Sequence, residues 1–232
     1  GRQRPELLQD YREAMRGVQQ DLVHQTSGPM NLTYIGELSV AGPVRKMDHL
    51  VCFLPGTLAL GAHNGVDAQD HMRLARELVR TCRELYRVPG YVLAPEIAFF
   101  DSFGKELFVK PGDAFYLLRP ETVESLFYLY RLTGETIYQD WGWEIARAIE
   151  QYAKVPGGGY TSVRTAEGTH SKDGSHVATQ DMDKMESFFT AETLKYLFLL
   201  FDDSRMQVPL QDFVFNTEAH PLHVLDATRA TA

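Results

Sequence analysis

The sequence predicts an all-α fold built from packed helix pairs, and two observations lead to that prediction. Apolar residues recur every three or four positions over much of the chain, which is the spacing of amphipathic helices. Residues 121–130 and 192–201 also share Glu, Thr, Leu, Phe and Leu at five of ten places, at an offset of 71 residues. One further helical segment lies between the two copies. This arrangement is expected if helix pairs repeat around a ring or stack along a solenoid.

Three helical segments are expected in the first half of the chain. Residues 6–24 carry an apolar stripe that ends before a Gly-Pro pair, and a helical pattern returns at residues 58–60. Residues 67–86 repeat apolar side chains at three- and four-residue steps until Pro89-Gly90 ends the pattern. Between the first two segments, residues 31–40 have the composition of a short strand.

Three more helices are expected in the second half. The clearest covers residues 120–130, where Pro120 suits the first helical position and Gly134 follows the apolar stripe. Residues 139–152 and 186–201 complete the set. Residues 166–180 are rich in Gly, Ser, Thr and His and predict an exposed loop, and a tail begins at residue 226.

Composition excludes several classes of protein. The chain has 232 residues, a formal net charge of −8 and a pI near 5.5, so it suits one globular domain and offers no basic surface for nucleic acid. No window approaches the 18 or more apolar residues of a membrane span. The two cysteines, Cys52 and Cys82, fit no zinc-binding pattern. They could form one disulfide or remain two buried thiols, and both readings stay open at this point.

Carboxylates dominate the candidate chemistry. Arg119, Glu121 and Glu124 share the first turn of one predicted helix, where acids commonly do no more than complement the helix dipole. Acids again alternate with aromatic rings around Phe188, an arrangement that can hold a sugar by ring stacking and hydrogen bonds. Further candidates are Glu96, the pair Asp48-His49, Glu186, Glu192 and the segment Asn216–Pro221. Phosphate-loop, dinucleotide, serine-hydrolase and zinc-protease motifs are absent, so the residues favour glycoside hydrolysis or a hard cation.

Eight strings of residues together resemble one enzyme family. They are HLVCFLPGTLALG from His49, LAPE ending at Glu96, LRPETVESLFYLYRLTG from Leu118, YQDWGWEI from Tyr138, GGYTS from Gly158, DKMESFF from Asp183, ETLKYLFLLF from Glu192 and FNTEAHPL from Phe215. The pattern is similar to the class I α-1,2-mannosidases of glycoside hydrolase family 47, most closely to the endoplasmic-reticulum branch. It spans nearly the whole chain but only about the C-terminal half of the family's catalytic domain.

The resemblance implies a fold, a compartment and a domain plan. The family fold is an (α/α)7 barrel, of which residues 1–225 would form part, with residues 226–232 as a tail. Cys52 and Cys82 match the family's disulfide pair, which implies the oxidising lumen of the endoplasmic reticulum or Golgi. The tripeptide Asn31-Leu32-Thr33 fits an N-glycosylation sequon in that compartment. Any membrane attachment would come from a segment outside this chain.

The resemblance also implies a calcium-dependent, inverting hydrolysis of terminal α-1,2-linked mannose on high-mannose N-glycans. Glu121 matches the proposed general base, and Thr217 matches the threonine that binds Ca²⁺ through its carbonyl and hydroxyl. Other matches to the sugar and metal pocket are Arg119, Glu124, Glu96, His49, Phe188, Glu192 and Glu218.

The family supplies its general acid, with a further catalytic aspartate, from the half of the domain that this sequence does not contain. We therefore expect this chain alone to be inactive. The alternative expectation is a non-catalytic mannose-binding protein of glycoprotein quality control, which would use the same pocket. An all-α scaffold without a sugar site ranks last, because it would not need Arg119, Glu121, Glu192 and Thr217 together.

Overall fold

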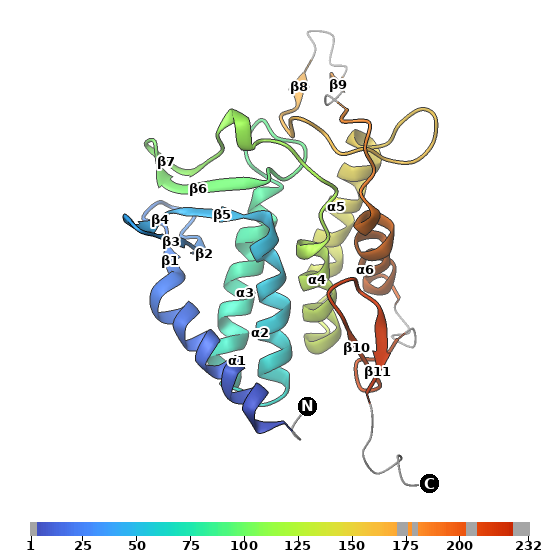
Figure 1. Ribbon diagram of the computed structural model, residues 1–232. Helices are drawn as coiled ribbons and strands as arrows, with labels where there is room; N and C mark the ends of the chain where they lie inside the picture. The colour runs from blue at the N-terminus through green and yellow to red at the C-terminus, as the bar shows by residue number, and fades with distance from the viewer. Residues whose placement is uncertain (1–3, 171–175, 178–180, 203–207, 225–232) are drawn as a thin grey trace.

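The computed structural model describes residues 4–170, 176–177, 181–202 and 208–224. Helices carry the core, and the strands form short antiparallel pairs at the ends of the helical layer (Figure 1). Within the described residues, no helix has the length and apolar character needed to cross a membrane.

Six α-helices make up the body of the described structure, and neighbours in sequence lie side by side (Figure 1). α2 packs on α3, and α4 packs on α2, α5 and α6, so the second to the sixth helices form one continuous core. α1 lies along the outside of this layer and has no buried residue of its own. The helices are α1 Pro5–Gly17, α2 Leu54–His63, α3 Ala68–Leu85, α4 Glu121–Thr133, α5 Ile137–Tyr152 and α6 Leu194–Leu200.

α4 is the central helix of the fold. All residues from Thr122 to Tyr130 are buried except Glu124, which is half-buried. A helix that is apolar around its whole circumference needs neighbours on every side, and α2, α5 and α6 supply them. Gly134 ends the helix in the left-handed region, at φ 75°.

A three-stranded antiparallel sheet, in the order β5-β6-β7, lies across one end of the helices. Its strands are β5 Lys46–Asp48, β6 Ile97–Ser102 and β7 Lys105–Phe108. Met47 pairs with Ala98, and this register places His49 directly beyond the end of β5. The sheet thus brings the segments before α2 and after α3 together at one edge.

The other strands form four two-stranded hairpins. These are β1 Val23–Gln25 with β2 Thr33–Ile35, β3 Glu37–Ser39 with β4 Gly42–Val44, β8 Thr169–His170 with β9 His176–Val177, and β10 Phe213–Phe215 with β11 Pro221–His223. Four short helical turns complete the described elements: the π-helices η1 Val18–Leu22 and η4 Phe189–Thr193, and the 3₁₀ helices η2 His49–Phe53 and η3 Pro111–Asp113.

The predicted helices are present, but several boundaries were wrong. The first helical segment ends at Leu22 rather than residue 24: α1 ends at Gly17, the π-helix η1 continues to Leu22, and Val23 and His24 pair with Ile35 and Tyr34 in a β-hairpin. The helix around residues 58–60 is longer than predicted and begins at Leu54. Residues 31–40 split into β2 and β3. The predicted loop at 166–180 contains β8 and β9; its residues 171–175 and 178–180, and the tail from 226, lie outside the described residues.

The two cysteines form a disulfide. Cys52 in η2 is bonded to Cys82 in α3 across a separation of 30 residues, and both are buried. The bond joins the segment that leads into α2 to the last turn of α3. Of the two readings that the sequence left open, the structure confirms the disulfide.

α2 and α4 approach each other closely at Gly56. A Cβ at this position would lie 2.9 Å from Tyr128 Cδ2 and 3.3 Å from Ser125 Cα. The Gly56 amide also donates a hydrogen bond of 2.9 Å to Ser125 Oγ. Because a backbone atom forms one side of the contact, a side chain cannot be accommodated by a rotamer change alone.

Gly56→Ala should therefore destabilise the fold by about 1–3 kcal/mol, the usual cost of overpacking a core. Gly17→Ala is the matched control, because Gly17 is helical and a Cβ there would meet nothing within 4 Å. It should be neutral or stabilise the protein by up to about 1 kcal/mol. Urea unfolding of both variants checks the prediction, and equal stabilities would contradict the close packing of α2 on α4.

Candidate active site

The predicted site residues gather at the start of α4. Leu118, just before it, has a left-handed backbone with φ 61°, which is uncommon for a leucine. Its carbonyl accepts a hydrogen bond of 2.7 Å from the buried Thr193 hydroxyl of η4. This bond fixes the turn before α4 against η4. Arg119 and Glu121, which follow the turn, therefore lie near the residues of η4.

Arg119 and Glu96 form a forked ion pair. Arg119 Nε lies 2.9 and 3.0 Å from the two carboxylate oxygens of Glu96, and Nη2 lies 2.5 Å from Oε1. Glu96 is only 7% exposed, so this fork compensates a charge that is almost removed from water. The half-buried ring of Phe188 lies on the other side, 5.7 Å from the guanidinium carbon. One guanidinium thus joins a fixed carboxylate and an aromatic ring.

Glu121 is held by His49. His49 Nδ1 lies 3.2 Å from Glu121 Oε2, and the imidazole is completely buried. Burial by itself would raise the pKa of Glu121. The hydrogen bond and charge of His49, the backbone N–H of Glu121 and the charge of Arg119 outweigh it and lower the pKa below its usual value. Glu121 is therefore a carboxylate that stays ionised in a largely dry place.

Tyr86 and Thr122 occupy the far side of the imidazole. The Tyr86 hydroxyl lies 3.1 Å and the Thr122 hydroxyl 3.3 Å from His49 Nε2. Burial raises the pKa of Tyr86 well above its usual value, so this phenol keeps its proton. An ionised carboxylate only accepts, so Nδ1 donates to Glu121. The two hydroxyls thereby hold the ring with Nδ1 towards the Glu121 carboxylate.

Two further acids, Glu124 and Glu192, lie close enough to Glu121 to repel it and each other, and Glu218 repels Glu192. Burial, with repulsion from Glu121 and Glu192, raises the pKa of Glu124 to about 7, although Tyr196 donates a hydrogen bond of 3.2 Å to it. Burial and repulsion from Glu218 and Glu121 likewise raise the pKa of Glu192 to about 7. The site therefore combines one carboxylate that stays ionised with two whose pKa values lie near neutral pH.

Thr217 and Glu218 lie on the exposed tip between β10 and β11. The Asn216 side chain shapes this tip by accepting hydrogen bonds from the backbone amides of Glu218 at 3.1 Å and His220 at 2.8 Å. Lys195 fixes the tip to the helical layer by donating a bond of 2.7 Å to the Ala219 carbonyl. The tip thus presents a hydroxyl and a carboxylate beside the acids of η4 and α4.

The structure brings most of the predicted residues together. Contacts or electrostatic interactions connect His49, Glu96, Arg119, Glu121, Glu124, Phe188, Glu192 and Glu218. Asp48 does not join them, because it pairs with Lys46 at 2.8 Å on the outer strand. Glu186 lies at the edge of the group and pairs with Lys184 at 2.7 Å.

Sequence reasoning missed Tyr86, Thr122, Thr193 and Tyr196. Each acts through a hydrogen bond between two segments that are at least 37 residues apart in the sequence. No local motif marks such a bond. The only local signal was the position of Tyr86 at the end of the α3 stripe, which is equally typical of a core residue.

Metal binding by several protein side chains is not supported in the described part of the chain, where no three His, Cys, Asp or Glu residues are grouped closely enough to hold an ion. Thr217 offers carbonyl and hydroxyl oxygens, and the acids beside it repel one another, since Glu218 contributes to the raised pKa of Glu192. This set suits a hard cation that keeps water ligands, such as Ca²⁺.

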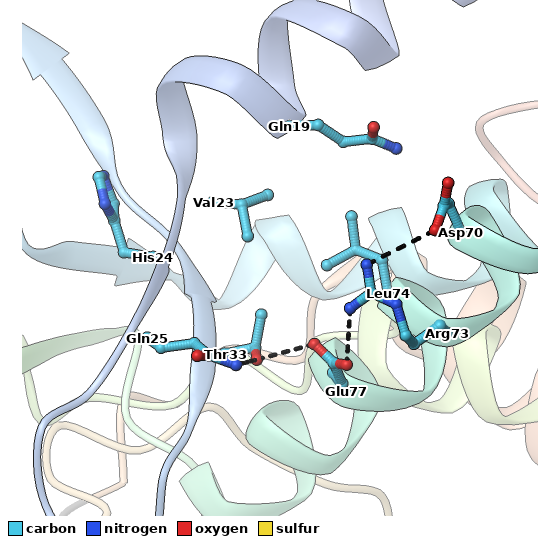
Figure 2. A pocket seen from close by; sticks show the side chains of 9 residues that line it. All are labelled: Gln19, Val23, His24, Gln25, Thr33, Asp70, Arg73, Leu74 and Glu77. Carbon is cyan, nitrogen blue, oxygen red and sulfur yellow. Dashed lines mark hydrogen bonds and ion pairs between the residues drawn. The ribbon is translucent and has the colours of Figure 1, made fainter.

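A separate hollow of about 560 Å³ lies between the end of α1 and α3 (Figure 2). Its charged groups already satisfy one another: Arg73 lies 2.9 Å from Glu77 and 3.8 Å from Asp70. None of the predicted site residues lines it, so we assign it no role in the chemistry. The lining residues are Gln19, Val23, His24, Gln25, Thr33, Asp70, Arg73, Leu74 and Glu77.

Known proteins are similar to this chain in sequence and in fold. The model of glycosyl hydrolase family 47 matches residues 1–224. The chain is 50% identical over 228 residues to the endoplasmic reticulum mannosyl-oligosaccharide 1,2-alpha-mannosidase of Mus musculus. The aligned region covers 97% of this chain and 33% of the relative. It is 43% identical over 234 residues to the enzyme of the same name from Schizosaccharomyces pombe, covering 91% of this chain and 43% of the relative.

Among solved structures, the alpha-1,2-mannosidase from Trichoderma reesei superposes with a TM-score of 0.79 at 26% identity. The match covers 95% of this chain and 48% of that protein. It confirms the predicted fold class, an all-α (α/α) barrel of which this chain forms a part. The chain spans about a third of the length of the mouse relative.

Removing the guanidinium of Arg119 should be costly, because it leaves the buried Glu96 carboxylate unpaired. We expect Arg119→Ala to lower the free energy of unfolding by about 3–5 kcal/mol, and Arg119→Lys to lower it less. Arg73→Ala is the control: its side chain is 63% exposed, so losing its ion pairs should cost about 1 kcal/mol or less. Urea unfolding measures all three, and similar losses for Arg119→Ala and Arg73→Ala would contradict the buried fork.

Proposed function

The chain belongs to glycosyl hydrolase family 47, and we propose that it is the C-terminal part of the catalytic domain of an α-1,2-mannosidase. In a longer protein, residues 1–225 would form this part and residues 226–232 a tail. The substrate would be terminal α-1,2-linked mannose on high-mannose N-glycans. The observation that carries the proposal is Glu121, a largely buried carboxylate kept ionised by His49 and Arg119.

The compartment follows from the same relationship. The relatives are named as endoplasmic reticulum enzymes, and the Cys52–Cys82 disulfide suits an oxidising lumen. We place the protein in the secretory pathway, in the endoplasmic reticulum or Golgi lumen, where newly made N-glycans are processed.

Glu121 acts as the general base. Its carboxylate accepts a proton from water while the water oxygen bonds to the anomeric carbon, and the bond to the leaving oxygen breaks on the opposite face. This displacement inverts the anomeric centre. The leaving oxygen takes a proton from a carboxylic acid that residues outside this chain supply, so the chain alone is inactive.

His49 and Tyr86 keep the base ready. His49 Nδ1 fixes one carboxylate oxygen of Glu121, and the other remains available to water. Tyr86 holds the imidazole from behind, so the base does not rotate towards the acids beside it. Both are positioning residues for Glu121.

The remaining predicted residues bind the sugar. The Phe188 ring offers a stacking surface beside Arg119, whose orientation the Glu96 fork fixes. Glu124, Glu192 and Glu218 can accept hydrogen bonds from sugar hydroxyls when ionised, and Glu124 and Glu192 can also donate when protonated.

Ca²⁺ fits beside this sugar site. The carbonyl and hydroxyl of Thr217 would hold it, and the nearby acids would bind its water ligands. When bound, the ion would supply positive charge that orients sugar hydroxyls and offsets the repulsion among the acids.

A mannose-binding protein without turnover is the second candidate function. It would rest on the same groups, because the Phe188 ring and the oriented Arg119 can hold a sugar without any turnover. Such a protein would bind glycans with the same residues and release nothing.

Glu121→Gln tests the base. In a protein extended upstream to include the general acid, mannose release from a high-mannose glycan should fall by about 10²–10⁴-fold, the usual contribution of a general base. Glycan binding and stability should be retained, since an amide of the same shape can still accept from His49. Glu13→Gln on the exposed face of α1 is the control. Unchanged release by Glu121→Gln would contradict the role, and glycan binding without release by the unmodified protein would favour the second candidate.

Thr217→Val tests the calcium ligand, because it removes the hydroxyl but keeps the shape. Supporting groups around metal ligands are worth about 10–100-fold in affinity, so losing a ligand should cost at least that much. Thr217→Ser keeps the hydroxyl and should bind nearly as well as the unmodified protein. Calorimetric Ca²⁺ titration of the extended protein measures these affinities, and equal binding by the Val and Ser variants would rule out the hydroxyl as a ligand.

A further inference from the structure

The sequon Asn31-Leu32-Thr33 lies on an exposed turn far from the candidate site in the chain. Asn31 is exposed and occupies the left-handed region, at φ 46°. Among the described contacts, none involves its side-chain amide, so a substituent on that nitrogen would displace no protein partner. Asn31 is also the only asparagine of this sequence that stands in a sequon.

Hydrogen bonds fix the backbone of this exposed turn. Arg80 donates to the carbonyls of Met30 at 3.0 Å and Asn31 at 2.6 Å. The Met30 amide donates 3.0 Å to Glu106 of β7, which also accepts from the Thr26 hydroxyl. These bonds fix the backbone from both sides and leave the Asn31 side chain as the outward group.

The third residue of the sequon is not accessible in the folded protein. Thr33 is 1% exposed in β2, and its hydroxyl donates 3.0 Å to Glu77 while accepting 3.3 Å from Gln25. Its backbone is paired with Gln25 in β1. An enzyme that needs the sequon hydroxyl can therefore reach it only before β1, β2 and α3 have come together.

We propose that Asn31 carries an N-linked oligosaccharide, attached before the N-terminal hairpin folds. The Asn31 amide nitrogen forms a bond to the anomeric carbon of a lipid-linked oligosaccharide diphosphate and loses a proton. The bond from that carbon to phosphate breaks, and the lipid diphosphate leaves with the electron pair. The inference rests on the proposed function only for its compartment, where such donors occur, and the disulfide supports that compartment independently.

The test expresses the full protein that contains this chain in eukaryotic cells, with its own secretory signal or a supplied one. An amidase that releases N-glycans is applied in heavy-oxygen water, and mass spectrometry of the Asn31 peptide follows. The expected result is conversion of Asn31 to a heavy-oxygen aspartate in the unmodified protein. An Asn31 peptide found only as unmodified asparagine overturns the inference.

Three variants make the result specific. Asn31→Asp and Thr33→Val should lose the glycan, whereas Thr33→Ser should retain it, because serine keeps the hydroxyl. Asn31→Asp removes no described contact and suits the left-handed backbone, so the test does not depend on Thr33→Val folding. A glycan on Thr33→Val at the level of the unmodified protein would also overturn the inference.

The timing has its own measurement. Protein folded with its disulfide formed should gain no glycan when added to detergent-permeabilised microsomal membranes, whereas the same protein added there reduced and unfolded should be modified at Asn31. Equal modification of the folded protein would contradict attachment before folding. Mannose release is assayed in parallel. An active protein without a glycan at Asn31 contradicts this inference alone. A protein that is glycosylated at Asn31 but inactive contradicts the proposed function alone.

Discussion

The burial of α4 on all sides is the constraint on which the rest of the structure depends. Its apolar residues require α2, α5 and α6 as neighbours, and those contacts leave its first turn largely buried, with Glu121 and Glu124 only partly exposed. The two carboxylates of that turn must therefore be compensated by protein groups. His49 and Arg119 stabilise the Glu121 carboxylate and lower its pKa, whereas the hydrogen bond from Tyr196 only partly offsets the burial of Glu124. The two acids therefore differ in pKa. The helix that forms the core also creates the chemistry at its end.

Elements outside the helical layer deliver the compensating groups. The register of β5 with β6 places His49 beside Glu96, because the His49 amide donates a hydrogen bond of 2.8 Å to the Glu96 carbonyl, and both side chains reach the helix start from this edge. The disulfide fixes η2, which begins at His49, to α3, which carries Tyr86 at its end. The β10–β11 tip adds Glu218 and Thr217 from the far end of the chain. The strands are short, yet they position most of the polar side chains.

Local periodicity was enough to predict the helices but not all their boundaries. Residues 54–57 were missed because Pro55 and Gly56 resemble helix breakers, although proline is tolerated in the first turn and glycine allows the close approach to α4. The first helical segment was extended by two residues because Val23 continues the apolar spacing of Val18 and Leu22 into the hairpin. The sheet β5-β6-β7 pairs segments about 50 residues apart, and no local pattern specifies such a register.

Site residues that lie close together in the sequence could be predicted, whereas those brought together only by the fold could not. The acids of the first α4 turn form a visible cluster in the sequence, and family resemblance added His49, Glu96 and Thr217. Asp48 looked like the partner of His49, but alternation along β5 turns it towards Lys46. Tyr86 and Tyr196 could not be found, because their roles arise only where separate helices meet.

The central claim is that Glu121 activates water rather than attacking the sugar itself. Proton NMR of the first mannose released from an α-1,2-linked mannoside by the extended protein distinguishes the two chemistries. Activation of water predicts β-mannose as the first product, which then equilibrates with the α anomer. If α-mannose appears first, the anomeric configuration has been retained, and the account of Glu121 as a general base is wrong.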